Sequence, residues 1–478
     1  MTRPELAVVV LAAGKGVRMK TALPKVLHAA AGTPLLGHVL ATSEHLGDAV
    51  GAGPRIVVIG AGRETVGPWL TATAPAAIQV VQDPPRGTGD ALKIASAAFG
   101  AASRVLVLSG DVPLLKAETL KLLVGALERP SPAAVAFLTA KVPDPGEYGR
   151  VVRDGSGEVL QIVEAKDATE AERQIDEINA GVYVFDRDFL DRALPLLTAA
   201  NAQGEYYLTD LVGIAVAERR RVVGVEVADA QEVLGVNSRR DLAEVDAILR
   251  RRAADAALDA GATLLRPETI TLDATVVVEP DAVLEPFTTL TGVTRVGTGA
   301  RIGQGSVIAD SAIGARAQVR PYCVIDRAVV GEGAVVGPFA RLREGTELGP
   351  DVHVGNFVET KKARLARGAK ANHLTYLGDV VIGERTNVGA GTITCNYDGF
   401  EKHLTRIGAG VFVGSDVQLV APVSIGDGAI IGAGTTVTKD VPADSLALSR
   451  TPQTVVPEGG AAYRRRRQAA KDAKQKGS

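Results

Sequence analysis

A short turn near the start of the chain combines small residues with basic ones, which is the chemistry of a phosphate-binding loop. It follows an apolar run, residues 6–11, that predicts a β-strand, and open α/β sheets bind ligands where such strands end. Gly14 and Gly16 lack the third glycine of a dinucleotide fingerprint, and the lysine–threonine pair that follows lacks the glycine of a Walker loop. Arg18 and Lys25 would reach phosphates from opposite sides of the turn. The alternative is a glycine hairpin whose basic side chains are only solvated.

A second group suited to chemistry is the carboxylate of Asp111. It follows an apolar run that begins at Val105, so it would lie at the carboxyl end of a strand. A carboxylate there is suited to holding a Mg²⁺ ion that bridges phosphates. Aspartate before Val-Pro is also ordinary turn chemistry, so a structural cap is the alternative.

Strand-like and helical segments alternate up to about residue 236. The strand-like runs are 56–60, 105–111, 134–140 and 180–185, and residues 117–128 have helical apolar spacing. This alternation predicts a mainly parallel α/β sheet.

A sustained helical pattern starts at Ser238, which is a suitable N-cap. Leu242, Val245 and Leu249 give the helix one apolar face, and Gly261 is a natural stop. We interpret this segment as a rigid connector.

Beyond residue 264 an aliphatic residue recurs at every sixth position. Val330 and Val336 belong to one such series, and another runs from Ile407 to Val437. The pattern predicts a parallel β-helix, in which each coil buries its apolar corner against the next. Parallel crossovers are normally right-handed, so general principles alone favour right-handed coiling. The register breaks at 360–379 and 394–406, and we expect inserted loops there that carry binding residues.

Composition limits the classes of protein that the chain can represent. Its 478 residues predict two or three domains, and a net charge of −2 gives no sign of a nucleic-acid-binding surface. Cys323 and Cys395 do not form a disulfide scaffold and fit a reducing cytoplasm. No cleavable leader is apparent, and no apolar run reaches about 18 residues, so we expect a cytoplasmic protein without membrane insertion. The charged end, from Tyr463, predicts disorder.

The motifs of both halves resemble one enzyme family. "LAAGKGVRM" with "LPK" is similar to the signature loop of sugar-1-phosphate nucleotidyltransferases, and "GNFVETKKARL", "HLTYLGD" and "GAGTITCNYDG" are similar to left-handed β-helix acetyltransferases. In this order they resemble the bacterial bifunctional N-acetylglucosamine-1-phosphate uridylyltransferase and glucosamine-1-phosphate acetyltransferase family, over roughly residues 5–452.

The resemblance implies an α/β architecture in four parts. These are a Rossmann-like nucleotidyltransferase domain at 1–237, a connecting helix at 238–262, a left-handed parallel β-helix of hexapeptide repeats at 263–452 that carries acetyltransferase activity, and a disordered basic tail at 453–478. It also implies acetylation of glucosamine 1-phosphate by acetyl-CoA. Mg²⁺-dependent uridylyl transfer from UTP to N-acetylglucosamine 1-phosphate would follow, releasing pyrophosphate. The product, UDP-N-acetylglucosamine, would feed peptidoglycan and lipopolysaccharide synthesis and so support cell shape. A homotrimer with only small-molecule substrates is expected, without nucleic-acid partners.

The resemblance assigns roles to residues of the first half. Arg18 and Lys25 would act on the triphosphate, and Asp111 and Asn237 would bind the metal. The residues expected to bind UTP or UDP-N-acetylglucosamine are Leu11, Ala12, Ala13, Gly14, Lys25, Gln82, Gly87, Thr88, Ser109, Gly110, Asp111, Gly149, Glu164, Asn179 and Asn237. Three positions depart from the family pattern: Ser109 replaces a frequent tyrosine, and Pro85 and Asp90 stand where glutamine and histidine are common.

In the second half, His373 would be the general base, with Glu359 to orient it. Four residues would hold glucosamine 1-phosphate: Arg341, Lys361, Tyr376 and Asn387. Six would contact acetyl-CoA: Ala390, Asn396, Tyr397, Ser415, Ala433 and Arg450. The hydroxyl of Tyr397 is also a candidate donor to the oxyanion.

Three alternatives remain open at this point. The chain could be a nucleotidyltransferase with one activity whose β-helix only regulates or oligomerises, or a non-catalytic scaffold like some translation-factor subunits that pair the same folds. His353, His373 and His403 could bind zinc, although their separations show no short ligand spacing.

Overall fold

The computed structural model describes residues 6–14, 16–50, 52–128, 131–449 and 452–476. Contacts between residues divide the chain into two compact units, which are described separately below. Unit 1 comprises Met1–Asp259, Thr271–Val276 and Leu290–Gly292, and unit 2 comprises Ala260–Ile270, Val277–Thr289 and Val293–Ser478.

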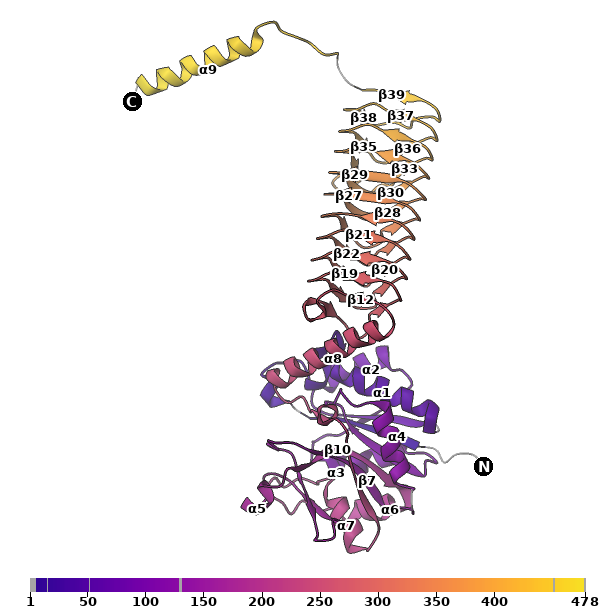
Figure 1. The fold of residues 1–478 in the computed structure, drawn as a ribbon, viewed down its shortest axis with the longest axis vertical. Helices are drawn as coiled ribbons and strands as arrows, with labels where there is room; N and C mark the ends of the chain where they lie inside the picture. Colours follow the sequence, from indigo (N-terminus) through magenta and orange to yellow (C-terminus); the bar gives the residue numbers. More distant parts are fainter. Residues whose placement is uncertain (1–5, 15, 51, 129–130, 450–451, 477–478) are drawn as a thin grey trace. The chain divides into compact units, whose positions relative to one another are not determined.

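Unit 1 is built on one sheet (Figure 1). Its strands are β1 (Leu6–Ala12), β4 (Ala52–Ile59), β5 (Ile78–Val81), β6 (Arg104–Ser109), β7 (Val135–Lys141), β8 (Arg150–Arg153), β9 (Val159–Val163), β10 (Glu177–Asp186) and β11 (Val222–Glu226). The main path is β11–β7–β10–β6–β1–β4–β5, and β8 joins β10 and pairs with β9. β1 is parallel to β4 and β6, whereas β10 is antiparallel to β6 and β7. Along this main path the predicted mainly parallel sheet is confirmed, with β10 as the exception. Off the path, β8 pairs antiparallel with both β10 and β9.

Helices cover both faces of this sheet. The helices are α1 (Leu35–Val50), α2 (Arg63–Thr73), α3 (Thr88–Ala95), α4 (Ala117–Ala126), α5 (Glu170–Arg173), α6 (Arg187–Ala193) and α7 (Asp210–Ala217). Because side chains alternate along a strand, Val8 and Val10 of β1 pack with α1, α2 and α4, while Ala7 and Val9 pack with α3, α6 and α7. A small separate hairpin pairs β2 (Ala29–Ala30) with β3 (Thr33–Pro34). The arrangement is the predicted Rossmann-like domain.

The predicted connecting helix is α8 (Arg239–Asp259). Ser238 caps it as expected: its Oγ accepts a hydrogen bond from Asp241 N at 3.3 Å, and the Asp241 carboxylate accepts from Ser238 N at 2.9 Å. Val245 of the apolar face is buried in a cluster that includes Met19. The helix therefore packs on the α/β domain and counts as part of unit 1.

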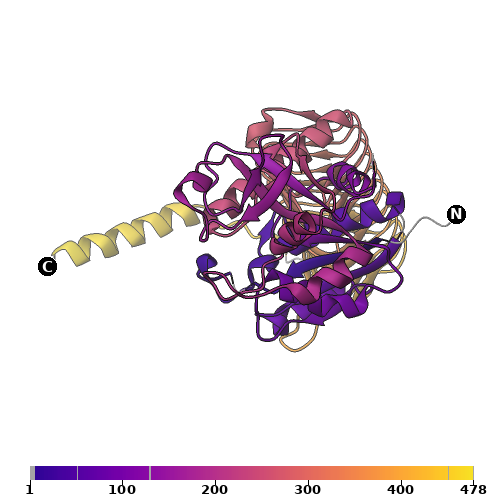
Figure 2. The same cartoon turned by 90° about the horizontal axis from the view of Figure 1, so that it is seen from below.

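Most of unit 2 is a stack of parallel coils, shown in Figure 1 and viewed from below in Figure 2. Residues 271–276 and 290–292 of the first coils are counted with unit 1. One ladder comprises β12 (Thr263–Leu264), β15 (Val283–Leu284), β18 (Arg301–Ile302), β21 (Gln318–Val319), β24 (Val335–Val336), β27 (His353–Asn356), β29 (Lys370–His373), β31 (Asn387–Val388), β34 (Phe412–Val413), β37 (Ile430–Ile431) and β39 (Leu446–Ala447). The second comprises β13 (Thr271–Leu272), β14 (Val277–Val278), β16 (Thr289–Thr291), β17 (Arg295–Val296), β19 (Val307–Ala309), β20 (Ala312–Ile313), β22 (Val324–Asp326), β23 (Val329–Val330), β25 (Arg341–Leu342), β26 (Glu347–Leu348), β28 (Glu359–Leu365), β30 (Tyr376–Ile382), β32 (Ile393–Cys395), β33 (Thr405–Ile407), β35 (Gln418–Val420), β36 (Val423–Ile425) and β38 (Thr436–Val437).

The six-residue repeat sets the register of these coils. Val330, Val336 and Leu342, which follow one another at this spacing, are each at most 1% exposed. Each therefore fills the interior of the coil in which it lies, and the predicted parallel β-helix is confirmed.

One of the two predicted register breaks is wrong and the other is confirmed. Through 360–379 both ladders continue, and Tyr376 pairs with Glu359 only 17 residues earlier, so this coil carries no insertion. His373 consequently ends strand β29 and does not lie in a loop. Through 394–406 the chain does leave the ladder, because Asn387 pairs with Phe412, 25 residues later.

The tail also differs from expectation, since residues predicted to be disordered form α9 (Gly459–Lys476). Its alanine, arginine, lysine and glutamine residues are strong helix formers, and no proline interrupts them. Within the described part of the chain, no helix is both long and apolar enough to span a membrane.

Candidate active sites

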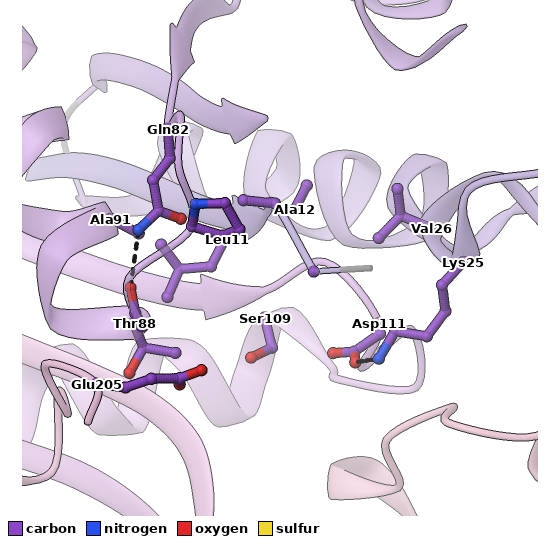
Figure 3. Close-up of a pocket in the computed structure, with 14 residues that line it drawn as sticks. Leu11, Ala12, Lys25, Val26, Gln82, Thr88, Ala91, Ser109, Asp111 and Glu205 are labelled. Atoms are coloured by element: carbon purple, nitrogen blue, oxygen red, sulfur yellow. Dashed lines mark hydrogen bonds and ion pairs between the residues drawn. The ribbon is translucent and has the colours of Figure 1, made fainter. Parts of the chain in front are cut away.

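A cavity of about 390 Å³ opens in unit 1 where β1 and β6 end (Figure 3). Most of the predicted nucleotide-binding residues line it: Leu11, Ala12, Ala13, Gly14, Lys25, Gln82, Gly87, Thr88, Ser109 and Asp111. The parallel strands bring these residues together because their carboxyl ends share one edge of the sheet. Val26, Ala91 and Glu205 also line the cavity and were not predicted.

Lys25 and the two predicted metal ligands meet beside this cavity. The Lys25 ammonium forms an ion pair with the Asp111 carboxylate, drawn in Figure 3, and donates to Asn237 Oδ1 at 3.0 Å. The Lys25 and Asp111 side chains are only 12% and 21% exposed, so water screens this pair weakly. Two side-chain oxygens therefore converge on one cationic group, although 126 residues separate them in the sequence.

The opposite wall of the cavity is the start of α3. Gly87 precedes this helix with φ +104°, and a Cβ there would lie 2.5 Å from the carbonyl oxygen of Tyr206. Only glycine fits such a position without strain. The neighbouring Thr88 accepts a hydrogen bond through its hydroxyl oxygen from Leu208 N at 3.1 Å, which fixes the wall to the chain before α7.

Arg18 faces a second cavity, of about 230 Å³, and does not line the first. Its guanidinium forms an ion pair with Glu147, a residue that was not predicted. Tyr148 and Asn237 line the same cavity, and burial raises the pKa of Tyr148, whose hydroxyl accepts from Gly235 N at 3.0 Å. Asn237 thus belongs both to the Lys25 cluster, which comprises Lys25, Asp111 and Asn237, and to the lining of the cavity that Arg18 faces.

The residues predicted to hold the sugar form a third group. Asn179 N donates to Gly149 O at 2.9 Å, and a Cβ on Gly149 would lie 3.6 Å from a carboxylate oxygen of Glu164. Burial raises the pKa of Glu164, although Thr209 donates to this carboxylate at 3.2 Å. Glu164 lines a cavity of about 520 Å³.

In unit 2, one corner of the coils carries a column of predicted site residues. Ladder pairing sets Asn356 against His373, and the register of the next strands brings Ala390, Ser415 and Ala433 to the same position in successive coils. The His373 ring hydrogen-bonds through Nδ1 to Asn356 Oδ1 at 3.1 Å. The His373 imidazole therefore stands at one end of a strip of small residues, Ala390, Ser415 and Ala433.

A second column lies on the neighbouring face, where Arg341, Glu359 and Tyr376 pair in register. The Glu359 carboxylate accepts from Arg343 Nη1 at 2.8 Å, whereas the recorded hydrogen bond of the His373 ring is with Asn356. Orientation of His373 by Glu359 stays a prediction, and Asn356 is a second candidate for that role.

The loop between β32 and β33 adds the remaining groups. Asn396 is buried and donates to Asp379, while the Tyr397 hydroxyl donates to Gly399 O at 2.6 Å. Lys402 pairs with Tyr397 in a short antiparallel bridge, and contact with the Lys361 ammonium lowers the pKa of Lys402. The two ammonium groups therefore lie close together. Lys361 also pairs with Glu344 at 3.4 Å, and Arg450 lies outside the described residues.

Sequence reasoning missed Asn356, Lys402 and Glu147. A local signal existed for two of them, because Lys402 lies within the predicted inserted loop and Glu147 directly precedes Tyr148-Gly149. Asn356 lies in the quoted motif "GNFVETKKARL", but the motif gives no sign of its contact with His373, which is 17 residues away in the next coil.

The donor set of the Lys25 cluster fits Mg²⁺. Asp111 and Asn237 offer one carboxylate and one amide oxygen, which are the hard ligands that Mg²⁺ prefers, and both already face a cation. Among the described residues, no three His, Cys, Asp or Glu side chains gather closely enough to hold a metal by themselves. A magnesium ion here would need phosphate or water oxygens to complete its coordination.

Comparison with known proteins extends over both halves of the chain. Bifunctional protein GlmU of Sorangium cellulosum (strain So ce56) is 49% identical over 453 residues, which is 94% of this chain and 94% of that protein. Bifunctional protein GlmU of Trichlorobacter lovleyi (strain ATCC BAA-1151 / DSM 17278 / SZ) is 48% identical over 94% of this chain and 96% of its own length. The chain belongs to the GlmU family of bifunctional proteins.

Family matches to parts of the chain agree with this assignment. Residues 8–191 match the MobA-like NTP transferase domain, 267–366 match the GMPPB C-terminal domain, and 404–439 match the bacterial transferase hexapeptide family. The predicted family and fold class are confirmed, including the left-handed sense of the β-helix that resemblance implied. As a member of this family, the chain is a bifunctional transferase for UDP-N-acetylglucosamine synthesis, which argues against the alternatives with one activity or none.

Proposed function

We propose that unit 1 transfers uridylyl from UTP to N-acetylglucosamine 1-phosphate and that unit 2 first acetylates glucosamine 1-phosphate with acetyl-CoA. The observation that carries the first assignment is the meeting of Lys25, Asp111 and Asn237 beside a cavity lined by small residues. Attack of one phosphate on another requires charge neutralisation and alignment more than covalent help, and these groups supply both.

Asp111 and Asn237 would hold the magnesium ion, which supplies charge neutralisation at the phosphates when bound. Lys25 would then pair with phosphate oxygens in place of Asp111. Arg18, with Tyr148 and Asn237 around its cavity, would neutralise the pyrophosphate that leaves. Gly149, Glu164 and Asn179 would hold the N-acetylglucosamine part of the second substrate.

His373 would accept the proton of the glucosamine amine as the nitrogen attacks the thioester carbon of acetyl-CoA. Collapse of the tetrahedral intermediate forms the amide and expels the thiolate of CoA. The sugar phosphate would be held by Arg341, Lys361, Tyr376 and Asn387. We add Lys402 to this set because it lies against Lys361.

A shallow groove for the pantetheine arm would be left by the small residues Ala390, Ser415 and Ala433. Beside this groove would lie Asn396, Tyr397 and Arg450. This strip begins one coil beyond His373 on the same corner, which supports a thioester lying along it. From the family we also expect a cytoplasmic homotrimer.

A paired assay on the intact chain tests both assignments. Pyrophosphate release is measured with Mg²⁺, UTP and N-acetylglucosamine 1-phosphate, and thiol release with acetyl-CoA and glucosamine 1-phosphate. Asp111→Ala should abolish the first and spare the second, and His373→Ala should do the reverse. Loss of both activities in either correctly folded variant would contradict the two-site division. His353→Ala is the matched control for His373 and should keep both activities.

A further inference from the structure

The side-chain amide of Gln82 is held by two acceptors at the wall of the 390 Å³ cavity. Gln82 is only 3% exposed, and its backbone N donates to Ile59 O at 2.8 Å. Its Nε2 donates to Gly87 O at 3.0 Å and to Asp90 Oδ2 at 2.8 Å. Both hydrogens of the amide are therefore used inside the protein.

These partners determine which end of the amide faces a ligand. A backbone carbonyl and a carboxylate only accept hydrogen bonds, so the amide nitrogen must face them. The Asp90 carboxylate is the charged acceptor of the two, so its hydrogen bond to the amide is the stronger one. In Figure 3 the Gln82 oxygen points away from the bonded side, toward Leu11. The amide thus offers a ligand its oxygen alone.

The acceptors themselves are fixed by the start of α3. Asp90 lies in the first turn of this helix, where a carboxylate also interacts favourably with the helix dipole. Gly89 N donates to Tyr206 O at 2.8 Å, and a Cβ on Gly89 would lie 2.7 Å from Leu197. Because this turn is held against the neighbouring chain, the Gln82 amide cannot rotate without losing both partners.

We propose that Asp90 is a positioning residue that sets base selectivity through Gln82. A fixed acceptor accommodates a pyrimidine whose N3 carries a hydrogen, as in uracil, and disfavours cytosine, whose N3 carries a lone pair. The inference rests on the proposed uridylyl transfer. A site built to accept a hydrogen bond from its ligand strongly rejects an analogue that lacks the donor. A hydrophobic pocket discriminates far less between ligands of similar shape.

The decisive variant is Asp90→Asn, because an amide at this position both donates and accepts. Gln82 then gains an alternative orientation, in which its oxygen accepts from the introduced amide and its nitrogen faces the base, at the cost of the hydrogen bond to Gly87 O. We expect the ratio of kcat/KM for UTP to that for CTP to fall about tenfold or more, chiefly through a lower KM for CTP and a higher KM for UTP. The kcat with UTP should change little, because the base lies away from the reacting phosphate. A merely structural role of Asp90 would lower activity with both nucleotides alike.

The matched control is Asp83→Asn, which removes a carboxylate next to Gln82 in the sequence that bonds Arg63 instead. It should leave the UTP to CTP ratio unchanged. Thiol release in the acetyl-transfer assay reports that each variant is folded. If Asp90→Asn does not fold, Asp90→Ser makes the same prediction, since a hydroxyl also donates and accepts.

An unchanged ratio in a folded Asp90 variant overturns the proposal, and so does a wild-type protein that uses CTP as well as UTP. Failure of the proposed function itself looks different. In that case the wild-type protein releases no pyrophosphate from any nucleoside triphosphate with N-acetylglucosamine 1-phosphate.

Discussion

Lys25 occupies the position between Asp111 and Asn237 that a metal would take, with its ammonium paired to the carboxylate and 3.0 Å from the amide oxygen. The protein thus holds its own cation on the ligands that we assign to Mg²⁺. We therefore expect lysine and metal to compete for Asp111 until a triphosphate offers the lysine a new partner.

This competition predicts opposite effects of Lys25→Ala on metal binding and on catalysis. In the absence of nucleotide, the variant should bind Mn²⁺, a spectroscopic substitute for Mg²⁺, several-fold more tightly than wild type, as measured by electron paramagnetic resonance. Its kcat for pyrophosphate release should fall by roughly 10² or more, because a charge on the phosphates is lost. Lys20→Ala, in the same turn, should change neither quantity. Weaker metal binding in Lys25→Ala would contradict the competition.

The buried carboxyl of Glu164 predicts a pH-dependent stability. Burial raises its pKa, so the folded state binds a proton more strongly than the unfolded state does. Ionisation of Glu164 therefore destabilises the folded state. This destabilisation is absent below the ordinary carboxyl pKa and grows as pH rises through the raised pKa. Glu164→Gln should therefore raise the melting temperature of unit 1 at neutral pH, and this gain should shrink as pH falls. Scanning calorimetry across the acid range measures it.

Glu172 provides the control of opposite sign. Hydrogen bonds from Thr169 lower its pKa, so its stabilising effect is present above the ordinary carboxyl pKa and is lost as pH falls through the lowered pKa. Glu172→Gln should lower the melting temperature at neutral pH. Equal shifts in the two variants would show that burial of Glu164 is not the cause.

Lys402 should matter for the sugar phosphate although no sequence motif singled it out. It lies against Lys361, and two ammonium groups in contact are stabilised when a dianion binds between them. Lys402→Ala should raise the KM for glucosamine 1-phosphate about tenfold while changing the KM for acetyl-CoA little. Lys439→Ala removes an exposed lysine on a later coil and should have no effect. The idea fails if Lys402→Ala alters only the KM for acetyl-CoA.

The two cysteines should differ in reactivity toward iodoacetamide. Cys323 is buried, and burial raises its pKa to about 11, so its thiolate is scarce at neutral pH. Cys395 is partly exposed and adjoins Asn396, which we propose to lie beside the acetyl-CoA groove. Mass spectrometry should find a label on Cys395 alone, with loss of acetyl transfer and retention of pyrophosphate release. Cys395→Ser should protect the acetyl transfer from the reagent.

The periodic and strand-end features were predictable from the sequence because each depends on neighbours along the chain. The sixth-residue pattern at Val330 and Val336 predicted the coils, and the small residues around Gly14 predicted the cavity wall. The expected loop around His373 was wrong for a related reason. A coil one residue short disturbs the sequence pattern as an insertion does, yet the ladder absorbs it.

The missed contacts depend on distances that the sequence does not express. Arg18 and Glu147 are 129 residues apart, and nothing local distinguishes this arginine from one free to reach a phosphate. The helix α9 was not predicted because a charged segment without apolar periodicity is also typical of disorder, although its residue types favour a helix. Asn356 and His373 are likewise in contact but lie 17 residues apart in the sequence, because they belong to neighbouring coils.

The column from His373 through Ala433 limits where this chain can change in length. A residue added inside β29 or β31 would change which side chains of that strand reach the corner, and would move His373 or Ala390 off it. The connections between strands tolerate such a change, because coils of 17 and 18 residues stack in the same ladder. Residues added between Asn396 and Leu404 leave the ladder untouched, because the chain already departs from it there. That loop is where the chain can lengthen without disturbing the ladder, provided that Tyr397 and Lys402 keep their bridge.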